Sequence, residues 1–208
     1  MKRILTIDGG GIKGTLPVAF LAALEEDLDR PIGEYFDLIS GTSTGGILAI
    51  GLALGHSAKE LLALYEERGP HIFGEEEELG RLGRILRGLR SKSRRVYMPK
   101  HDADVLRAEL DAVFNGALIG DAKTRLIIPA WDADHQSVYI YKTAHHERLE
   151  TDYLRPALDA AMATAAAPTY FKRHKTVDDV GLLDGGVWAN KGNILDAVQV
   201  LCLEHSYH

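Results

Sequence analysis

Apolar residues in the first quarter of the chain fall into short runs that suit strands and longer stretches that suit helices. Residues 3–7 form a short apolar run that predicts a buried strand, and residues 16–28 predict a helix after a glycine-rich loop. Residues 36–40 predict a second strand. Residues 44–54 are apolar on nearly every side, which predicts a buried helix that ends at Gly55.

The remaining sequence continues this alternation. Ser57 and Glu60 have the spacing of a capping box, which predicts a helix that runs to about residue 68. Further helices are expected at residues 101–114, 153–166 and 194–204, and further strands at 125–130, 138–142 and 180–184. Alternating strands and helices predict an α/β fold, a three-layer sandwich whose largely parallel central sheet is covered on both faces. The length of 208 residues favours one domain over residues 1–208.

Composition and charge narrow the classes of function. The net charge of −6 argues against a protein that binds nucleic-acid polymers. Cys202 is the single cysteine, so an internal disulfide and a cysteine-based metal site are both excluded. The first apolar run stops at Asp8, too early for a signal peptide, and no run approaches the ~20 residues that span a bilayer. We therefore expect a soluble, cytoplasmic protein.

The loop "IDGGGIKG" has two possible functions. Gly9, Gly11 and Gly14 fit the G-x-G-x-x-G pattern that binds a pyrophosphate, but consecutive N–H groups of such a loop can also stabilise an oxyanion. A dinucleotide site also needs an acidic residue at the end of the second strand. Here Asp37 lies near the start of that strand, so a nucleotide-binding module is the less favoured alternative.

The stretch "GTSTGG", residues 41–46, follows the second predicted strand. It fits G-x-S-x-G at a strand-to-helix junction, where a tight turn presents a serine hydroxyl to substrate. The helix that follows would place its positive N-terminal end near a developing anion. Ser43 is therefore a candidate nucleophile, although a Ser/Thr-rich helix cap is the alternative interpretation.

A nucleophilic serine needs a base, and Asp184 in "LLDGG" is the candidate. Alone, the D-G-G sequence predicts only a turn. Together, Ser43, Asp184 and the glycine loop would supply a nucleophile, a base and a group of N–H donors that binds an anion. Each lies at the carboxyl end of a predicted strand, where the sites of open α/β sheets gather.

Four pieces of the chain, "DGGGIKG", "GTSTGG", "ATAAAPTYF" and "DGGVWAN", resemble the patatin-like phospholipase family. They occur in the family's order over residues 8–190. The resemblance implies a patatin-like fold and a Ser-Asp dyad without histidine, in which Ser43 attacks an ester carbonyl of a phospholipid or related acyl lipid and Asp184 takes its proton. It implies neither a metal nor an organic cofactor.

The resemblance also implies roles for residues in the loops around this dyad. It implies that the oxyanion is held by the backbone N–H groups of Gly9, Gly10 and Gly11. The supporting residues that it implies are Lys13, Gly14, Gly41, Gly45 and Gly185. A carboxylate in a poorly solvated site is a stronger base than in water, which makes such a dyad physically reasonable.

Some features depart from the family. Ala165 stands where serine is common, and only 24 residues follow Asp184, fewer than family domains generally carry. A shortened, inactive structural relative is therefore an alternative. His205 follows Asp184 and would allow a conventional triad, although we expect it to lie in a fraying tail. We interpret His71 and the pair at 145–146 as surface histidines.

Residues 75–100 contain a candidate accessory segment. On a helix its leucines would share one face and its arginines the opposite one, so residues 79–95 could contact a membrane or form a lid. The alternative is a surface helix that packs its leucines on the core. Residues 141–171 also look similar to bacterial relatives that act in cyclic-nucleotide anti-phage systems, so a cyclic nucleotide regulator is a further hypothesis.

Overall fold

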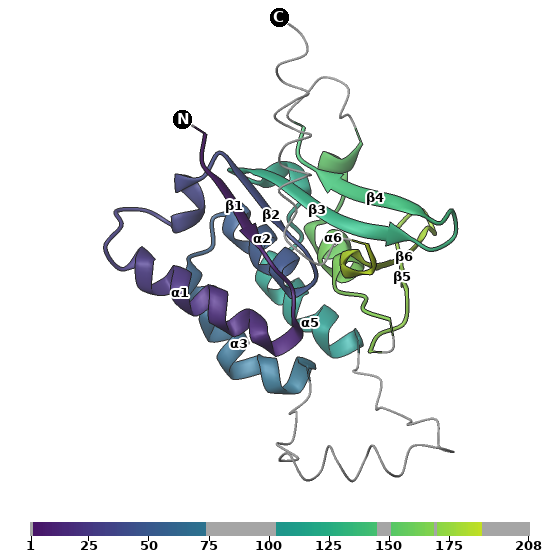
Figure 1. The fold of residues 1–208 in the computed structure, drawn as a ribbon, viewed down its shortest axis with the longest axis horizontal. Helices are drawn as coiled ribbons and strands as arrows, with labels where there is room; N and C mark the ends of the chain where they lie inside the picture. The colour runs from purple at the N-terminus through teal and green to yellow at the C-terminus, as the bar shows by residue number, and fades with distance from the viewer. Residues whose placement is uncertain (1, 74–102, 145–150, 169, 189–208) are drawn as a thin grey trace, which may run out of the picture.

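In the part of the chain that the structure describes, a six-stranded sheet flanked by helices forms the framework (Figure 1). The computed structural model describes residues 2–73, 103–144, 151–168 and 170–188, with the backbone alone for 70–73. The predicted α/β class is confirmed, and the sheet is mixed. The predicted helix at 194–204 and the accessory segment at 75–100 lie outside the described residues.

The first part of the chain matches its predicted elements closely. It contains the following strands and helices: β1 (Ile4–Ile7), α1 (Thr15–Glu25), β2 (Leu38–Gly41), α2 (Thr44–Leu54) and α3 (Ala58–Phe73). The capping box that starts α3 is present, because the Ser57 N–H donates to Glu60 and the Glu60 N–H donates to the Ser57 hydroxyl. Local sequence signals therefore determine where these elements start, whereas α1 ends three residues earlier than predicted and α3 runs to Phe73 instead of about residue 68.

The second part of the chain departs from the prediction in two places. Its elements are α5 (Ala103–Phe114), β3 (Arg125–Asp132), β4 (Ser137–Lys142), α6 (Ala157–Thr164), β5 (His174–Lys175) and β6 (Gly181–Asp184). The two-residue β5 was not predicted. The helix expected from residue 153 begins only at Ala157, because Pro156 disfavours a helical conformation at the preceding Arg155, whose ψ is 142°.

Strand β3 organises the sheet. Its residues 125–127 pair in parallel with β2, which in turn pairs in parallel with β1, whereas β4 pairs antiparallel along residues 127–132. Strand β6 pairs antiparallel with residues 130–132. A strand has only two edges, and β4 occupies one of them, so β2 and β6 share the other edge and approach each other from opposite directions.

This arrangement brings two strand ends together. The carboxyl end of β2 and the carboxyl end of β6 face each other beside the middle of β3, near Pro129. The peptide after β2 leads to Ser43, and β6 ends at Asp184. Long-range pairing along one edge of β3 therefore places two residues that are far apart in sequence next to each other.

The helix α2 lies at the centre of the hydrophobic core. Its residues from Thr44 to Ala53 are all buried, which agrees with the apolar character that the sequence shows around the whole helix. It packs with Ile39, Leu126 and Ile128 of the sheet. Each fully buried side chain of this kind contributes about 1.5–3 kcal/mol relative to exposure. The rigid core therefore fixes the N-terminus of α2, which Ser43 caps.

Candidate active site

Ser43 occupies a strained turn between β2 and α2. Its φ of 57° and ψ of −129° lie in a region that costs a non-glycine residue about 1–3 kcal/mol. The flanking glycines allow this turn: a Cβ at Gly41 would collide with the carbonyl oxygen of Gly45, and a Cβ at Gly45 would collide with that of Ile7. The two glycines of the predicted motif thus have a steric role.

Asp184 lies beside Ser43. The residue is 4% exposed, one carboxylate oxygen accepts the Gly186 N–H at 2.6 Å, and the Ser43 side chain lies close enough to the carboxylate to influence its pKa. Burial raises the pKa of the Asp184 carboxyl above its ordinary value, although the nearby Ser43 side chain and the Gly186 N–H act in the opposite direction. The carboxylate is therefore a stronger base than a solvated aspartate and is close to a hydroxyl group.

The turn after Asp184 packs tightly on β3. A Cβ at Gly185 would lie 2.5 Å from the carbonyl oxygen of Pro129, so only glycine fits there. The indole N–H of Trp188 donates to the carbonyl oxygen of Ala130 at 3.0 Å. These contacts hold the end of β6 against the middle of β3, which keeps Asp184 at the level of Ser43.

The glycine-rich loop lies directly against the elbow. A Cβ at Gly9 would lie 2.5 Å from the Ser43 Cβ, and Gly11 has a φ of 60°. The Gly10 N–H donates to the Thr44 hydroxyl at 3.1 Å, so it would have to leave this partner to bind an oxyanion. The Lys13 N–H donates to the carbonyl oxygen of Gly10 at 3.2 Å and closes the loop.

Sequence reasoning missed two residues that support this loop and elbow. The hydroxyl of the buried Tyr65 donates to the carbonyl oxygen of Thr44 at 3.0 Å, and its ring lies where a Cβ at Gly14 would collide. Thr164, at the end of α6, accepts the Ser43 N–H at 3.1 Å. Thr164 belongs to the motif "ATAAAPTYF", but nothing in that pattern indicates its contact with Ser43.

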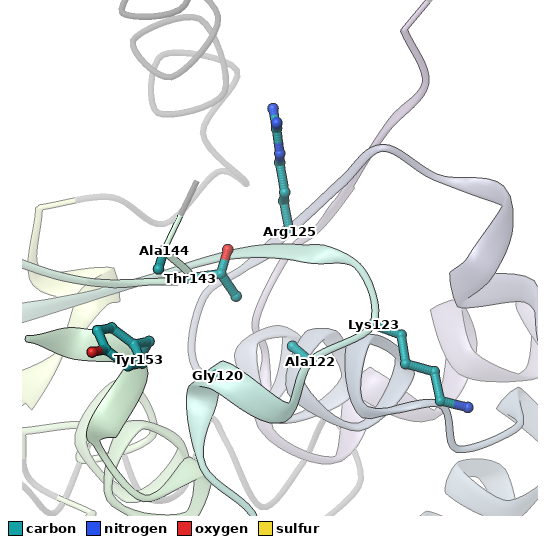
Figure 2. A pocket seen from close by; sticks show the side chains of 7 residues that line it. All are labelled: Gly120, Ala122, Lys123, Arg125, Thr143, Ala144 and Tyr153. Carbon is teal, nitrogen blue, oxygen red and sulfur yellow. The ribbon is translucent and has the colours of Figure 1, made fainter. Parts of the chain in front are cut away.

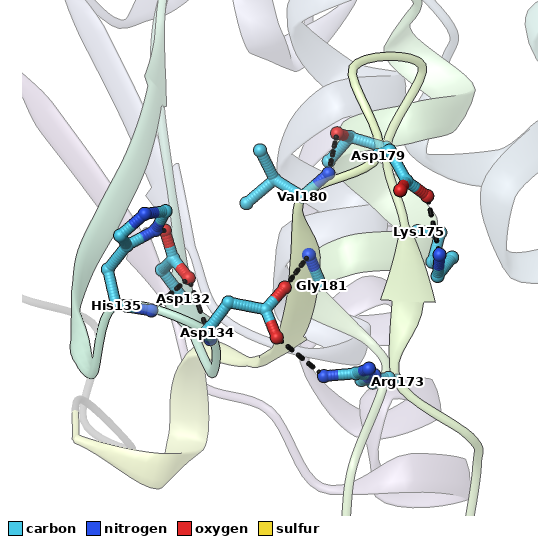
Figure 3. Close-up of polar contacts among 9 residues, drawn as sticks. Asp132, Asp134, His135, Arg173, Lys175, Asp179, Val180 and Gly181 are labelled. Carbon is cyan, nitrogen blue, oxygen red and sulfur yellow. Dashed lines mark hydrogen bonds and ion pairs between the residues drawn. The ribbon is translucent and has the colours of Figure 1, made fainter.

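A second set of polar contacts fixes the start of β6 (Figure 3). Asp134, in the β3–β4 turn, accepts the Gly181 N–H at 2.9 Å and pairs with Arg173 at 2.6 Å. Asp132, the last residue of β3, accepts from the ring of His135 in the same turn at 2.8 Å. The start of β6 is thus hydrogen-bonded to the β3–β4 turn, and the turn after its end packs on Pro129.

A buried polar cluster anchors α6. The Nε2 atom of His174 lies 2.5 Å from one carboxylate oxygen of Asp159, and the Tyr141 hydroxyl donates to the other at 3.2 Å. All three side chains are largely buried. The cluster links α6 to β4 and β5.

The histidines of the alternative interpretations cannot be placed. His205 and residues 145–146 lie outside the described residues, as does the side chain of His71. Within the described part of the chain, no group of three or more His, Cys, Asp or Glu side chains could hold a metal ion. None of the helices in that part is both long and apolar enough to cross a bilayer.

A cavity of about 390 Å³ lies at the other end of the sheet (Figure 2). It includes Arg125, the first residue of β3, whereas Ser43 follows the carboxyl end of the parallel strand β2. Figure 2 shows the side chains of Lys123 and Arg125 pointing in different directions, and Lys123 pairs with Glu34 at 3.4 Å. The cationic side chains therefore do not converge on one anion.

Comparison with known proteins links the chain to several relatives. The family model for patatin-like phospholipases matches residues 5–197. A cGAMP-activated phospholipase of Pseudomonas aeruginosa is 41% identical over 193 residues, which cover 90% of this chain and 53% of that protein. A cGAMP-activated phospholipase of Vibrio cholerae is 35% identical, with 95% and 57% covered. The chain therefore spans little more than half the length of these relatives.

A solved structure has a similar fold. The crystal structure of VipD from Legionella pneumophila superimposes with a TM-score of 0.57 over 93% of this chain and 47% of that one. The two sequences are only 15% identical, so the similarity concerns the fold.

Proposed function

Because the chain belongs to the patatin-like phospholipase family, we propose that it is a serine acyl hydrolase that cleaves carboxylic ester bonds of phospholipids or related acyl lipids. One observation supports this proposal above all others: the side chain of Ser43, on a strained strand-to-helix elbow, lies close enough to the buried Asp184 carboxyl to influence its pKa, which burial raises. A nucleophile and a base of increased strength thus lie near each other.

In the proposed reaction, the Ser43 oxygen attacks the ester carbonyl carbon while its proton passes to the Asp184 carboxylate. The resulting tetrahedral intermediate carries a negative oxygen. When the bond to the leaving alcohol breaks, the proton on Asp184 goes to that alcohol, and Ser43 is left as an acyl ester. Asp184 then activates a water molecule, which releases the fatty acid and restores Ser43.

The glycine-rich loop is the proposed oxyanion hole. It lies against Ser43, and the backbone N–H groups of Gly9, Gly10 and Gly11 are the candidate donors. One donor of this kind is worth about 2.7–4 kcal/mol of the activation barrier. The bond from Gly10 to the Thr44 hydroxyl implies that Gly10 contributes only after a small rearrangement of the loop.

The names of two relatives support a regulatory proposal. Both are cGAMP-activated phospholipases, at 41% and 35% identity. We therefore propose that a cyclic nucleotide increases the activity of the protein to which this chain belongs. Peripheral membrane contact through residues 79–95 stays a proposal, because that segment lies outside the described residues.

The test is release of fatty acid from phospholipid vesicles, measured by mass spectrometry with and without cGAMP. Ser43→Ala and Asp184→Asn should abolish release, while Ser137→Ala, which removes an exposed serine on β4, should not change it. A fluorophosphonate probe should label the wild type and not Ser43→Ala. An unlabelled, inactive wild type would favour the inactive relative, and a melting temperature raised by NAD or NADP would favour the nucleotide-binding alternative.

A further inference from the structure

Thr164 has a hydroxyl whose two hydrogen bonds link two distant parts of the candidate site. The side chain is fully buried at the end of α6. Its oxygen accepts the Ser43 N–H at 3.1 Å, and its own proton is donated to the carbonyl oxygen of Pro129 at 2.7 Å. Because the donor and an acceptor of the hydroxyl are both used, its orientation is fixed.

The methyl group of Thr164 is also held in place. A Cβ at Gly46 would lie 2.6 Å from this methyl carbon, so the second glycine of "TGG" is the residue that makes room for Thr164. Packing on α2 therefore fixes one branch of the side chain, and hydrogen bonding fixes the other. This combination makes the contact with Ser43 a rigid one.

The same segment also holds Asp184. Two residues after Thr164, the carbonyl oxygen of Ala166 accepts the Asp184 N–H at 3.0 Å. The backbone N–H groups of Ser43 and Asp184 thus both donate to the segment 164–166, which begins at the last residue of α6. Upstream on this helix, Asp159 is bonded to His174 and Tyr141, which anchors the helix to the sheet.

We infer that Thr164 is a positioning residue: its hydroxyl holds the strained backbone of Ser43, and the segment from Thr164 to Ala166 sets Ser43 and Asp184 relative to each other. This inference rests on the proposed hydrolase function. A misplacement of about 1 Å at a reacting group can lower a rate by about 100-fold, so loss of this bond should reduce turnover more than substrate binding.

The experiment compares Thr164→Val, which keeps the shape and deletes the hydroxyl, with Thr164→Ser, which keeps the hydroxyl. Thr124→Val is the matched control, because Thr124 is also buried and donates to a carbonyl oxygen, that of Gly33, next to the first residue of β3. Thr164→Val should lower kcat by about 10- to 100-fold with KM within about twofold. Thr164→Ser should restore most of kcat, and Thr124→Val should leave it unchanged.

A kcat for Thr164→Val within about twofold of wild type would overturn the inference. If this variant fails to unfold cooperatively, Thr164→Ala replaces it, and full activity in that variant would have the same meaning. If Thr164→Val changed only KM, Thr164 would not be a positioning residue. The same conclusion would follow if Thr164→Ser did not restore kcat.

A second readout does not depend on activity. Hydrogen exchange at the Ser43 amide, followed by NMR, should be at least about tenfold faster in Thr164→Val than in wild type, and unchanged in Thr124→Val. If wild type neither hydrolyses lipids nor reacts with the fluorophosphonate, the proposed function fails, and this exchange rate still tests the contact. Unchanged exchange in Thr164→Val would overturn the inference whatever the activity.

Discussion

His174 and Asp159 form a buried pair, with 2.5 Å between the imidazole Nε2 atom and a carboxylate oxygen. The pair connects β5, which holds β6 at one edge, with α6, whose last residue bonds to Ser43. The Tyr141 hydroxyl completes the contacts of the carboxylate from β4. One cluster of three side chains therefore joins α6 to β4 and β5, and β5 in turn pairs with β6, which carries Asp184.

Breaking this pair should strongly destabilise the fold. His174→Ala leaves a buried carboxylate with Tyr141 as its side-chain partner, and removing one partner of a buried pair costs about 3–5 kcal/mol. Urea denaturation should detect this loss. His135→Ala is the control, because His135 also pairs with an aspartate but its ring is 74% exposed, so its removal should have little effect. Equal effects of the two substitutions would contradict the structural role of the His174–Asp159 pair.

The raised pKa of Asp184 predicts the acid side of the pH–activity profile. A protonated Asp184 cannot take the Ser43 proton, so kcat/KM should fall as the pH decreases through the pKa of this carboxyl. Burial places that pKa above the ordinary value of 3.8, and the fall should therefore begin at a higher pH than for an exposed aspartate. Hydrolysis of a soluble p-nitrophenyl ester across pH measures it. If kcat/KM stayed constant as the pH decreased to 3.8, the ordinary pKa of an aspartate, Asp184 would not be the base.

The sequence predicted those parts of the fold that local signals determine. The apolar run 44–54 gave the limits of α2 correctly, and the Ser57–Glu60 spacing gave the start of α3. The glycines around Ser43 predicted the elbow, because only glycine tolerates the close backbone contacts there. These signals depend on neighbours in sequence, which can be interpreted without knowledge of the tertiary structure.

Long-range contacts could not be predicted in this way. The two-residue β5 has no pattern of its own and forms because His174 and Lys175 pair with β6. The meeting of β2 and β6 along one edge of β3 depends on pairing between segments far apart in sequence: 87 residues separate the partners in β2 and β3, and 50–54 residues separate those in β3 and β6. Thr164 acts on Ser43 across 121 positions, so its contact becomes visible only in the folded chain.

Asp184→Asn should stabilise the protein while it abolishes activity. A carboxyl whose pKa is raised by folding contributes stability below its unfolded pKa, and this contribution is lost as the pH rises through the folded pKa. At neutral pH the buried charge therefore costs stability, and its removal should raise the free energy of unfolding by about 1 kcal/mol. Thermal unfolding at pH 7 tests this. Asp134→Asn is the contrasting variant and should not raise the melting temperature, because Asp134 is largely exposed and its charge pairs with Arg173. A lower melting temperature for Asp184→Asn would mean that its hydrogen bonds outweigh its burial.

Substitutions in the glycine loop should separate steric from conformational effects. Gly9→Ala would place a Cβ 2.5 Å from that of Ser43, so it should displace the nucleophile and lower kcat by about 100-fold. Gly11→Ala meets no atom within 4 Å, but its φ of 60° costs about 1 kcal/mol. Gly116→Ala is the matched control for that strain, because Gly116 also has a positive φ, 75°, with nothing within 4 Å.

Gly11→Ala and Gly116→Ala should therefore lower the melting temperature to a similar extent. If only Gly11→Ala also lowers kcat, the loop conformation itself contributes to catalysis, as an oxyanion hole requires. If Gly9→Ala keeps full activity, the glycine loop does not determine the position of Ser43, and the oxyanion donors would have to be sought at the N-terminus of α2.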